Sequence, residues 1–306
     1  MKVILAFFTI QRLFFYRDVV MKLLRELDPE GTKIRRRRRI LRRTYHSIGP
    51  NQIWHVDGYD KLKPYGFAIH GCIDGYSRKL LWLQVGPSNN DPAIVASNYV
   101  ECVQNMKGCP LILQADPGTE NITMGALQCL FRHDAADDFA GLGSFRVSRS
   151  VFNQRIEAWW SLFRRRKSQW WMQFFKDLEL MGVIHRGIIN ETHCLRYCFM
   201  PVLQLELSQI VEEWNTHFIS HSKVAECPNG RPDILHSLGG QDCLQPINEE
   251  DIALALNEVK VSSISGSEQF DGLANQIFVN KGMSDASDWT EALHNYVELL
   301  STLRNM

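Results

Sequence analysis

The hydrophobic pattern of residues 52–166 alternates between short β-rich runs and longer segments with helical spacing. The first three runs, QIWHVDG, GFAIHGCID and RKLLWLQV, are separated by turn-forming residues and predict three consecutive strands. A helix is expected over 91–106, because Asp91 can cap its start and Pro92 suits its first position.

The same region supplies two further strands and two further helices. PLILQAD is an apolar strand that ends at Asp116, MGALQCLF has helical spacing, and a short strand is expected near 144–148. A helix from Asn153 places Trp159 and Phe163 on one face and Glu157 on the other. This order of elements predicts a mixed α/β layered fold whose first three strands are antiparallel.

The flanking segments divide the chain into four expected regions. Residues 1–49 form a basic helical arm, also interpreted as a truncated DNA-binding module, with a helix over 1–27 that LDPEG stops. The core is expected over 50–185, a helical extension over 186–233 and an acidic, partly helical tail over 234–306. CPNGRPDIL is predicted to be irregular, GSEQFDG to be a linker, and 249–259 and 288–304 to be helices.

Charge is balanced overall but unevenly distributed. The 34 Lys and Arg residues match the 34 Asp and Glu residues, yet residues 1–50 carry 13 basic against 4 acidic side chains. Residues 233–306 carry 3 basic against 12 acidic side chains. This asymmetry favours a polyanion such as DNA as partner. The acidic tail is left with three alternatives: it binds a protein partner, screens the basic head or has no specific role.

The basic head contains the run KIRRRRRILRR, in which eight of eleven residues are basic. It is either a solvated linker or an arm that binds phosphates and directs nuclear import. Each cation that neutralises a phosphate releases counterions, so such an arm gives affinity without sequence preference. The arm's candidate DNA-binding residues are Arg35, Arg36, Arg37, Arg38 and Arg39.

Cysteine spacing argues for a reducing intracellular compartment. The eight cysteines contain no Cys-x-x-Cys pair, so no disulfide framework is expected. The spacing of Cys194 and Cys198 with His217 and His221 loosely resembles a zinc site, but both pairs lie in apolar helical stretches, and no zinc is expected. No apolar run reaches the ~18 residues of a membrane span, and no signal-peptide cleavage site follows the apolar start.

Three carboxylates are expected near the strand ends, where open α/β sheets commonly have their active sites. Asp57 and Asp116 end apolar strands, and Glu157 lies on the polar face of its helix. Each Asp alone is an ordinary turn former, because Asp-Gly and Asp-Pro-Gly are turn sequences. Gathered together, the three would repel one another unless divalent cations separate them. Mg²⁺ or Mn²⁺, in a two-metal site for phosphodiester chemistry, suits such oxygen ligands.

Residues 50–181 resemble the DDE integrase core of retroviral integrases and related transposases. The motifs IWHVDGYDKLKPYG, IDGYSR, GPSNNDP, ADPGTEN and NQRIEAWW are most similar to animal integrase-core proteins of transposon origin. The resemblance implies a ribonuclease-H-like mixed five-stranded sheet flanked by helices, and a homodimer or higher oligomer that handles two DNA ends. It also implies that Asp57, Asp116 and Glu157 form the metal-binding catalytic triad.

The resemblance assigns further residues and shows departures. It implies a structural role for Asp74 and DNA contacts for Gly118, Asn153 and Gln154. Forty residues separate Asp116 from Glu157, more than in retroviral enzymes, and Tyr59 and Pro117 replace the usual neighbours of the two aspartates. The family's zinc-binding His/His/Cys/Cys module is expected before the core, but residues 1–49 contain His46 and no cysteine.

The basic run after Glu157 and the tryptophans each have two interpretations. The basic run that starts with Arg164 and Arg165 is either a solvated helix end or a DNA-backbone contact. The tryptophans either stack on bases or pack in the core, and core packing is the expectation. The tryptophans concerned are Trp54, Trp159, Trp160, Trp170 and Trp171.

Three classes of function are compatible with these features. The first is a nuclear, metal-dependent DNA integrase that cleaves DNA and transfers strands. The second is a domesticated, catalytically inactive DNA-binding protein that keeps the integrase fold. The third is an interaction scaffold that uses the acidic tail and the tryptophan-rich surface.

Overall fold

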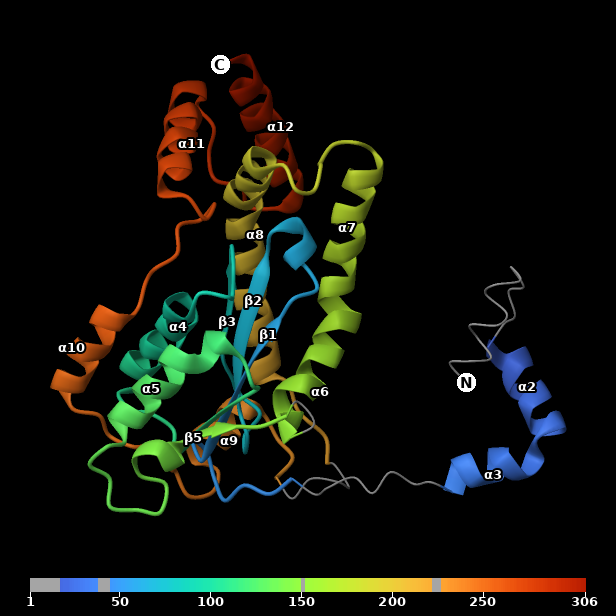
Figure 1. Ribbon diagram of the computed structural model, residues 1–306, viewed down its shortest axis with the longest axis vertical. Coiled ribbons are helices and arrows are strands. Elements are labelled where there is room, and N and C mark those ends of the chain that lie inside the picture. Colours follow the sequence, from blue (N-terminus) through green and yellow to red (C-terminus); the bar gives the residue numbers. More distant parts are fainter. Residues whose placement is uncertain (1–16, 38–44, 150–151, 222–226) are drawn as a thin grey trace. The chain divides into compact units, whose positions relative to one another are not determined.

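A mixed five-stranded sheet lies at the centre of residues 45–306 (Figure 1). The computed structural model describes residues 17–37, 45–149, 152–221 and 227–306. The strand order is β3-β2-β1-β4-β5, antiparallel among the first three and parallel from β1 to β5. This confirms the predicted arrangement. The strands are β1 (Ile53–Tyr59), β2 (Ala68–Asp74), β3 (Leu80–Gly86), β4 (Ile112–Ala115) and β5 (Phe145–Val147).

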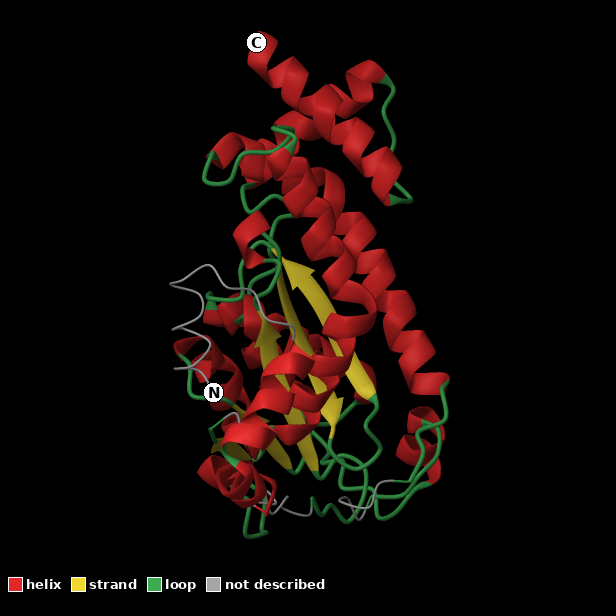
Figure 2. Ribbon diagram, turned by 90° about the vertical axis from the view of Figure 1, so that its right-hand side faces the viewer, coloured by secondary structure: helices red, strands yellow, loops and turns green. Residues whose placement is uncertain are grey.

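Helices cover both faces of the sheet, as Figure 2 shows in red on either side of the yellow strands. One face is covered by α4 (Pro92–Met106), α5 (Ile122–Phe131) and α10 (Glu249–Glu258), around a core that includes Trp54 and Tyr99. Asp91 caps α4 as predicted, because its carboxylate accepts a hydrogen bond of 3.0 Å from the backbone N–H of Ala93.

The other face is covered by a long, irregular helix and its partner. This helix consists of α6 (Gln154–Phe163), a π-helical turn (Arg164–Ser168) and α7 (Gln169–Leu180). It packs with α8 (Ile189–Thr216) over an aromatic core. The expectation that most tryptophans are core residues holds for Trp54, Trp159, Trp160 and Trp171, whereas Trp170 is 47% exposed.

The acidic segment is part of this packing. Besides α10, it forms α9 (Pro232–Leu238), α11 (Glu268–Lys281) and α12 (Trp289–Asn305), and α11 and α12 pack against α8. The predicted helices at 249–259 and 288–304 are therefore present. Two predictions are wrong: GSEQFDG contains the start of α11, because Ser267 accepts from the N–H of Phe270 as an N-cap, and CPNGRPDIL contains the first turn of α9.

The smaller unit, Met1–Thr44, is separate from Tyr45–Met306. Its described residues form α2 (Arg17–Leu27) and α3 (Pro29–Arg37). LDPEG ends α2 as predicted but also starts α3, because a proline at a helix start needs no N–H partner. Residues 1–16 of the predicted first helix lie outside the described residues. Among the described residues, no helix is both long and apolar enough to cross a membrane.

Candidate active site

The first candidate carboxylate, Asp57, lies on the central strand β1. Side chains alternate along this strand, so Val56 packs under α4 while Asp57 and Tyr59 face the α6 side. The indole Nε1 of Trp160, on α6, donates a hydrogen bond of 3.1 Å to Oδ2 of Asp57. The helix that carries Glu157 therefore also orients the carboxylate of Asp57.

The second carboxylate, Asp116, directly follows β4. In the parallel pairing of β1 and β4, Ile53 lies beside Ile112 and His55 beside Gln114. Continuing this register by two residues places Asp116 beside Asp57. The expectation that Asp57 ends its strand is wrong, because β1 continues to Tyr59, whereas Asp116 directly follows β4. The loop that follows contains Gly118, in an extended conformation with φ −164°, and leads through a 3₁₀ turn (Thr119–Asn121) into α5.

The third carboxylate, Glu157, lies in the first turn of α6. Burial and the charge of Asp116 raise its pKa above the ordinary value for a glutamate. Burial, followed by the charges of Asp116 and Glu157, raises the pKa of Asp57 from 3.8 to about 7. The backbone N–H of Gly58 and the Trp160 indole act in the opposite direction. Each of the three carboxylates thus lies within electrostatic reach of the other two.

The three carboxylates do not form a compact ligand set. Within the described part of the chain, no group of three or more His, Cys, Asp or Glu side chains could hold a metal ion as placed. Their chemistry nevertheless suits a hard divalent cation, which would offset the burial and the repulsion that raise the pKa of Asp57. The fold therefore brings these residues into one region without closing them around one point.

Asn153 differs from the expectation that it faces DNA. It is fully buried at the start of α6, where its Oδ1 lies 2.8 Å from Nδ1 of His55 and its Nδ2 donates to the carbonyl of Val56 at 2.9 Å. Its side chain therefore connects α6 to β1. The next residue, Gln154, is half-buried in the first turn of α6.

Two residues beside the carboxylates escaped the sequence interpretation. Burial lowers the pKa of His55 to about 4, so its ring is neutral near pH 7. Trp160 was predicted to be a core residue, but its indole also binds Asp57. The signal for His55 was a polar residue two positions before Asp57 inside an apolar strand. The indole donor of Trp160 left no signal in the sequence.

The candidate DNA-binding cations lie in two separate places. Arg164 and Arg165 are exposed on the π-helical turn, where the helix continues into α7, so the solvated residues of the first interpretation do not lie at a helix end. Arg35, Arg36 and Arg37 are the last residues of α3. Arg38 and Arg39 lie outside the described residues.

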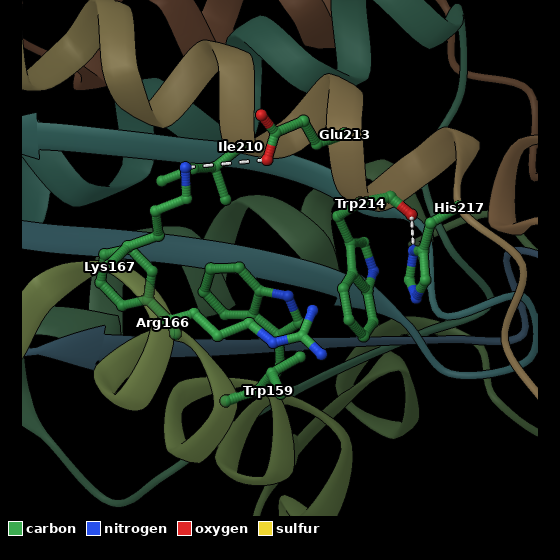
Figure 3. A pocket seen from close by; sticks show the side chains of 9 residues that line it. Trp159, Arg166, Lys167, Ile210, Glu213, Trp214 and His217 are labelled. Carbon is green, nitrogen blue, oxygen red and sulfur yellow. Dashed lines mark hydrogen bonds and ion pairs between the residues drawn. The ribbon is translucent and has the colours of Figure 1, made fainter.

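A pocket of about 210 Å³ lies between the π-helical turn and α8 (Figure 3). Trp159, Trp214 and His217 form aromatic walls, and Lys167 pairs with Glu213 across it at 3.7 Å. Trp159 is two positions after Glu157 and therefore points to the other side of α6. The pocket is thus separate from the carboxylates.

The loosely zinc-like residues have other surroundings, and His217 and His221 follow the end of α8 instead of lying in a helix as expected. Cys194 and Cys198 are buried in the aromatic core beside α12. The ring Nδ1 of His217 lies 2.5 Å from the carbonyl of Trp214, one turn earlier, and His221 is exposed.

A family model described as integrase core domain matches residues 44–229. The match covers more than half of the chain, which therefore belongs to the integrase core domain family. The mixed five-stranded sheet with helices on both faces is the ribonuclease-H-like architecture expected of such a core. A comparison with curated proteins finds no match.

Proposed function

We propose that the chain is a DDE-type polynucleotidyl transferase that cleaves DNA and transfers strands with the help of divalent cations. The observation that carries this proposal is the mutual electrostatic influence of Asp57, Asp116 and Glu157 within an integrase core. Three carboxylates from β1, the end of β4 and the start of α6 would hold Mg²⁺ or Mn²⁺. Bound there, the ions would activate the attacking oxygen and stabilise the leaving one.

The protein's own residues contribute orientation and charge. Trp160 fixes the direction of the Asp57 carboxylate, and Gly118 lets the Glu120 carboxylate approach the backbone closely in the loop after Asp116. The attacking oxygen is that of water in cleavage and of a DNA 3′-hydroxyl in strand transfer. One P–O bond forms as another breaks in line, and the leaving 3′-oxygen carries the electron pair away.

Basic residues supply the affinity for the DNA backbone in this proposal. Arg164 and Arg165 are exposed on the π-helical turn that follows α6, the helix of Glu157. The run Arg35 to Arg39 provides five further cations. Binding through such contacts weakens steeply with salt. Because integration joins two DNA ends to one target, a homodimer or larger assembly is expected, and nuclear import through the same arginine run is consistent with that role.

The test is plasmid nicking and strand transfer in Mn²⁺ with the wild-type chain and Glu157→Gln. We expect at least a 1,000-fold loss of rate, because the variant keeps the shape of the side chain and removes one ligand charge. Glu101→Gln, the same change on the exposed face of α4, is the matched control and should retain wild-type activity. Full activity of Glu157→Gln would refute the assignment.

The second candidate function is a catalytically inactive DNA-binding protein, and the absence of a compact ligand set among the described residues favours it. This protein would bind DNA in a salt-sensitive manner, unaffected by Glu157→Gln and strongly weakened by neutralising Arg35 to Arg39. Calorimetry with Mn²⁺ separates the two functions. Metal binding that Glu157→Gln weakens supports the transferase, whereas DNA binding with neither metal binding nor nicking supports the inactive protein.

A further inference from the structure

A buried chain of hydrogen bonds connects the strand of Asp57 to the helix of Glu157. The hydroxyl of Tyr45 lies 2.8 Å from Nε2 of His55, and Nδ1 of His55 lies 2.8 Å from Oδ1 of Asn153. Asn153 then donates through Nδ2 to the carbonyl of Val56 at 2.9 Å. His55 and Asn153 are 1% and 0% exposed, so water does not compete for these bonds.

The donor and acceptor of each bond can be assigned from the backbone carbonyl of Val56. The carbonyl of Val56 can only accept, so the amide nitrogen of Asn153 faces β1 and its oxygen faces His55. The Nδ1 of His55 must therefore carry the proton, and its Nε2 accepts from the hydroxyl of Tyr45. Each polar atom has one role, which is the condition under which a buried network holds a single geometry.

The network holds the backbone next to two of the candidate ligands. His55 and Val56 are the two residues before Asp57, and Asn153 is one turn before Glu157. Tyr45, at one end of this hydrogen-bonded series, is held in turn by Arg155, whose guanidinium carbon lies 4.1 Å from the centre of the tyrosine ring. A change in any of these bonds would therefore alter the spacing between the start of α6 and the strand of Asp57.

We infer that Tyr45, His55 and Asn153 are positioning residues that set the separation of Asp57 and Glu157. This inference rests on the proposed function and gives Asn153 a role different from a DNA contact. The misplacement of a catalytic group by about 1 Å costs on the order of 100-fold in rate even when the altered residue touches no substrate. The network would act on turnover and leave DNA affinity alone.

The decisive variant is Asn153→Ala, with Asn215→Ala as its matched control. Asn215 is also buried and also connects a helix to a strand, since it accepts from the N–H of Leu80 at 2.8 Å and donates to its carbonyl at 2.9 Å. Each change removes one accepted hydrogen bond and one bond donated to a backbone carbonyl within the same unit, so both variants should be less stable than the wild type. Of the two, Asn153 connects the strand of Asp57 to the helix of Glu157, whereas Asn215 connects α8 to β3.

We expect Asn153→Ala to lower kcat for nicking about 10- to 100-fold with KM for DNA within about twofold of wild type. Asn215→Ala should keep both parameters below its own melting transition. Tyr45→Phe removes the hydroxyl, with its hydrogen bonds to His55 and Arg155, and keeps the ring under Arg155, so it should lower kcat about 2- to 5-fold. If Asn153→Ala does not fold, Tyr45→Phe carries the test. A raised KM with unchanged kcat would mean that Asn153 contacts DNA and would overturn the inference.

Crystal structures of the same variants give a readout that does not depend on activity. The separation between the carboxyl carbons of Asp57 and Glu157 should change by more than about 0.5 Å in Asn153→Ala and stay fixed in Asn215→Ala. An unchanged separation in Asn153→Ala overturns the positioning role, whatever the activity. A wild-type chain without activity would instead refute the proposed function, and the structures would still decide the role of the network.

Discussion

The tripeptide Asp-Gly-Tyr occurs on two neighbouring strands of this protein, with opposite consequences. On β2, Asp74 is fully buried and its carboxylate accepts from the N–H groups of Asn51, Tyr76 and Ser77 and from the Ser77 hydroxyl, at 2.7–3.2 Å. On β1, Asp57 has one side-chain donor among the described residues, Trp160, and lies near two other carboxylates. The first aspartate fastens a turn, and the second is held in an environment that opposes its charge.

The two aspartates differ in the number of hydrogen-bond donors that surround each carboxylate. Asp74 ends its strand where the following turn offers backbone N–H groups, and such donors stabilise a buried negative charge. Asp57 lies within its strand, where the backbone is already paired to β2, so few donors remain for its side chain. A half-buried carboxylate with few donors, such as Asp57, has a raised pKa that a bound cation would lower, and such perturbed groups are typical of functional sites.

The largest test of this comparison replaces each aspartate by asparagine. Asp74→Asn should lower the free energy of unfolding by about 3 kcal/mol, because the new amide turns an N–H toward buried donors. Asp57→Asn should raise it by about 2 kcal/mol at pH 8, since it removes an unfavourable charge. Urea denaturation of both variants measures the two values. Changes of the same sign would remove the distinction between the two aspartates.

The pH dependence of stability sharpens the comparison. The pKa of Asp57 rises from 3.8 to about 7 on folding, so between these values the folded state holds a proton that the unfolded state has released. Protonation of Asp57 therefore contributes fully to the free energy of unfolding below pH 3.8, and this contribution is lost as the pH rises through 7. Its largest value is about 4 kcal/mol. Unfolding free energies from pH 4 to 8, measured relative to Asp57→Asn, should fall by about 2–4 kcal/mol. A flat difference would mean that neither burial nor the neighbouring carboxylates raise the pKa of Asp57.

The smallest effect concerns the one side-chain donor to Asp57. Trp160→Phe removes the indole N–H, which favours the charged carboxylate, and should move the titration of Asp57 to higher pH at a cost of about 1 kcal/mol above that pH. Trp159→Phe is the matched control, because the neighbouring ring is equally buried and faces the pocket on the other side of α6. An equal shift of the titration in both variants would indicate a general packing effect instead of the hydrogen bond.

Local pattern was sufficient for most elements of this fold. Period-two runs predicted the strands, and Asp91-Pro92 predicted the start of α4, because these signals depend on neighbouring residues. The acidic segment was less predictable. The helix over 288–304 was predicted, but the apolar residues of α11 have a partner only because α8 and α12 lie beside them, so the local sequence at its start suggested a linker.

The integrase core and its three carboxylates could be predicted without a structure, because ordered motifs are short runs of consecutive residues. Tertiary structure decided which aspartate is satisfied and which is strained by charge, although both are followed by Gly-Tyr. It also decided that Asn153 turns inward to His55, a contact between residues 98 positions apart. Burial, hydrogen-bond partners and charge repulsion depend on such distant residues, and the folded chain alone brings them together.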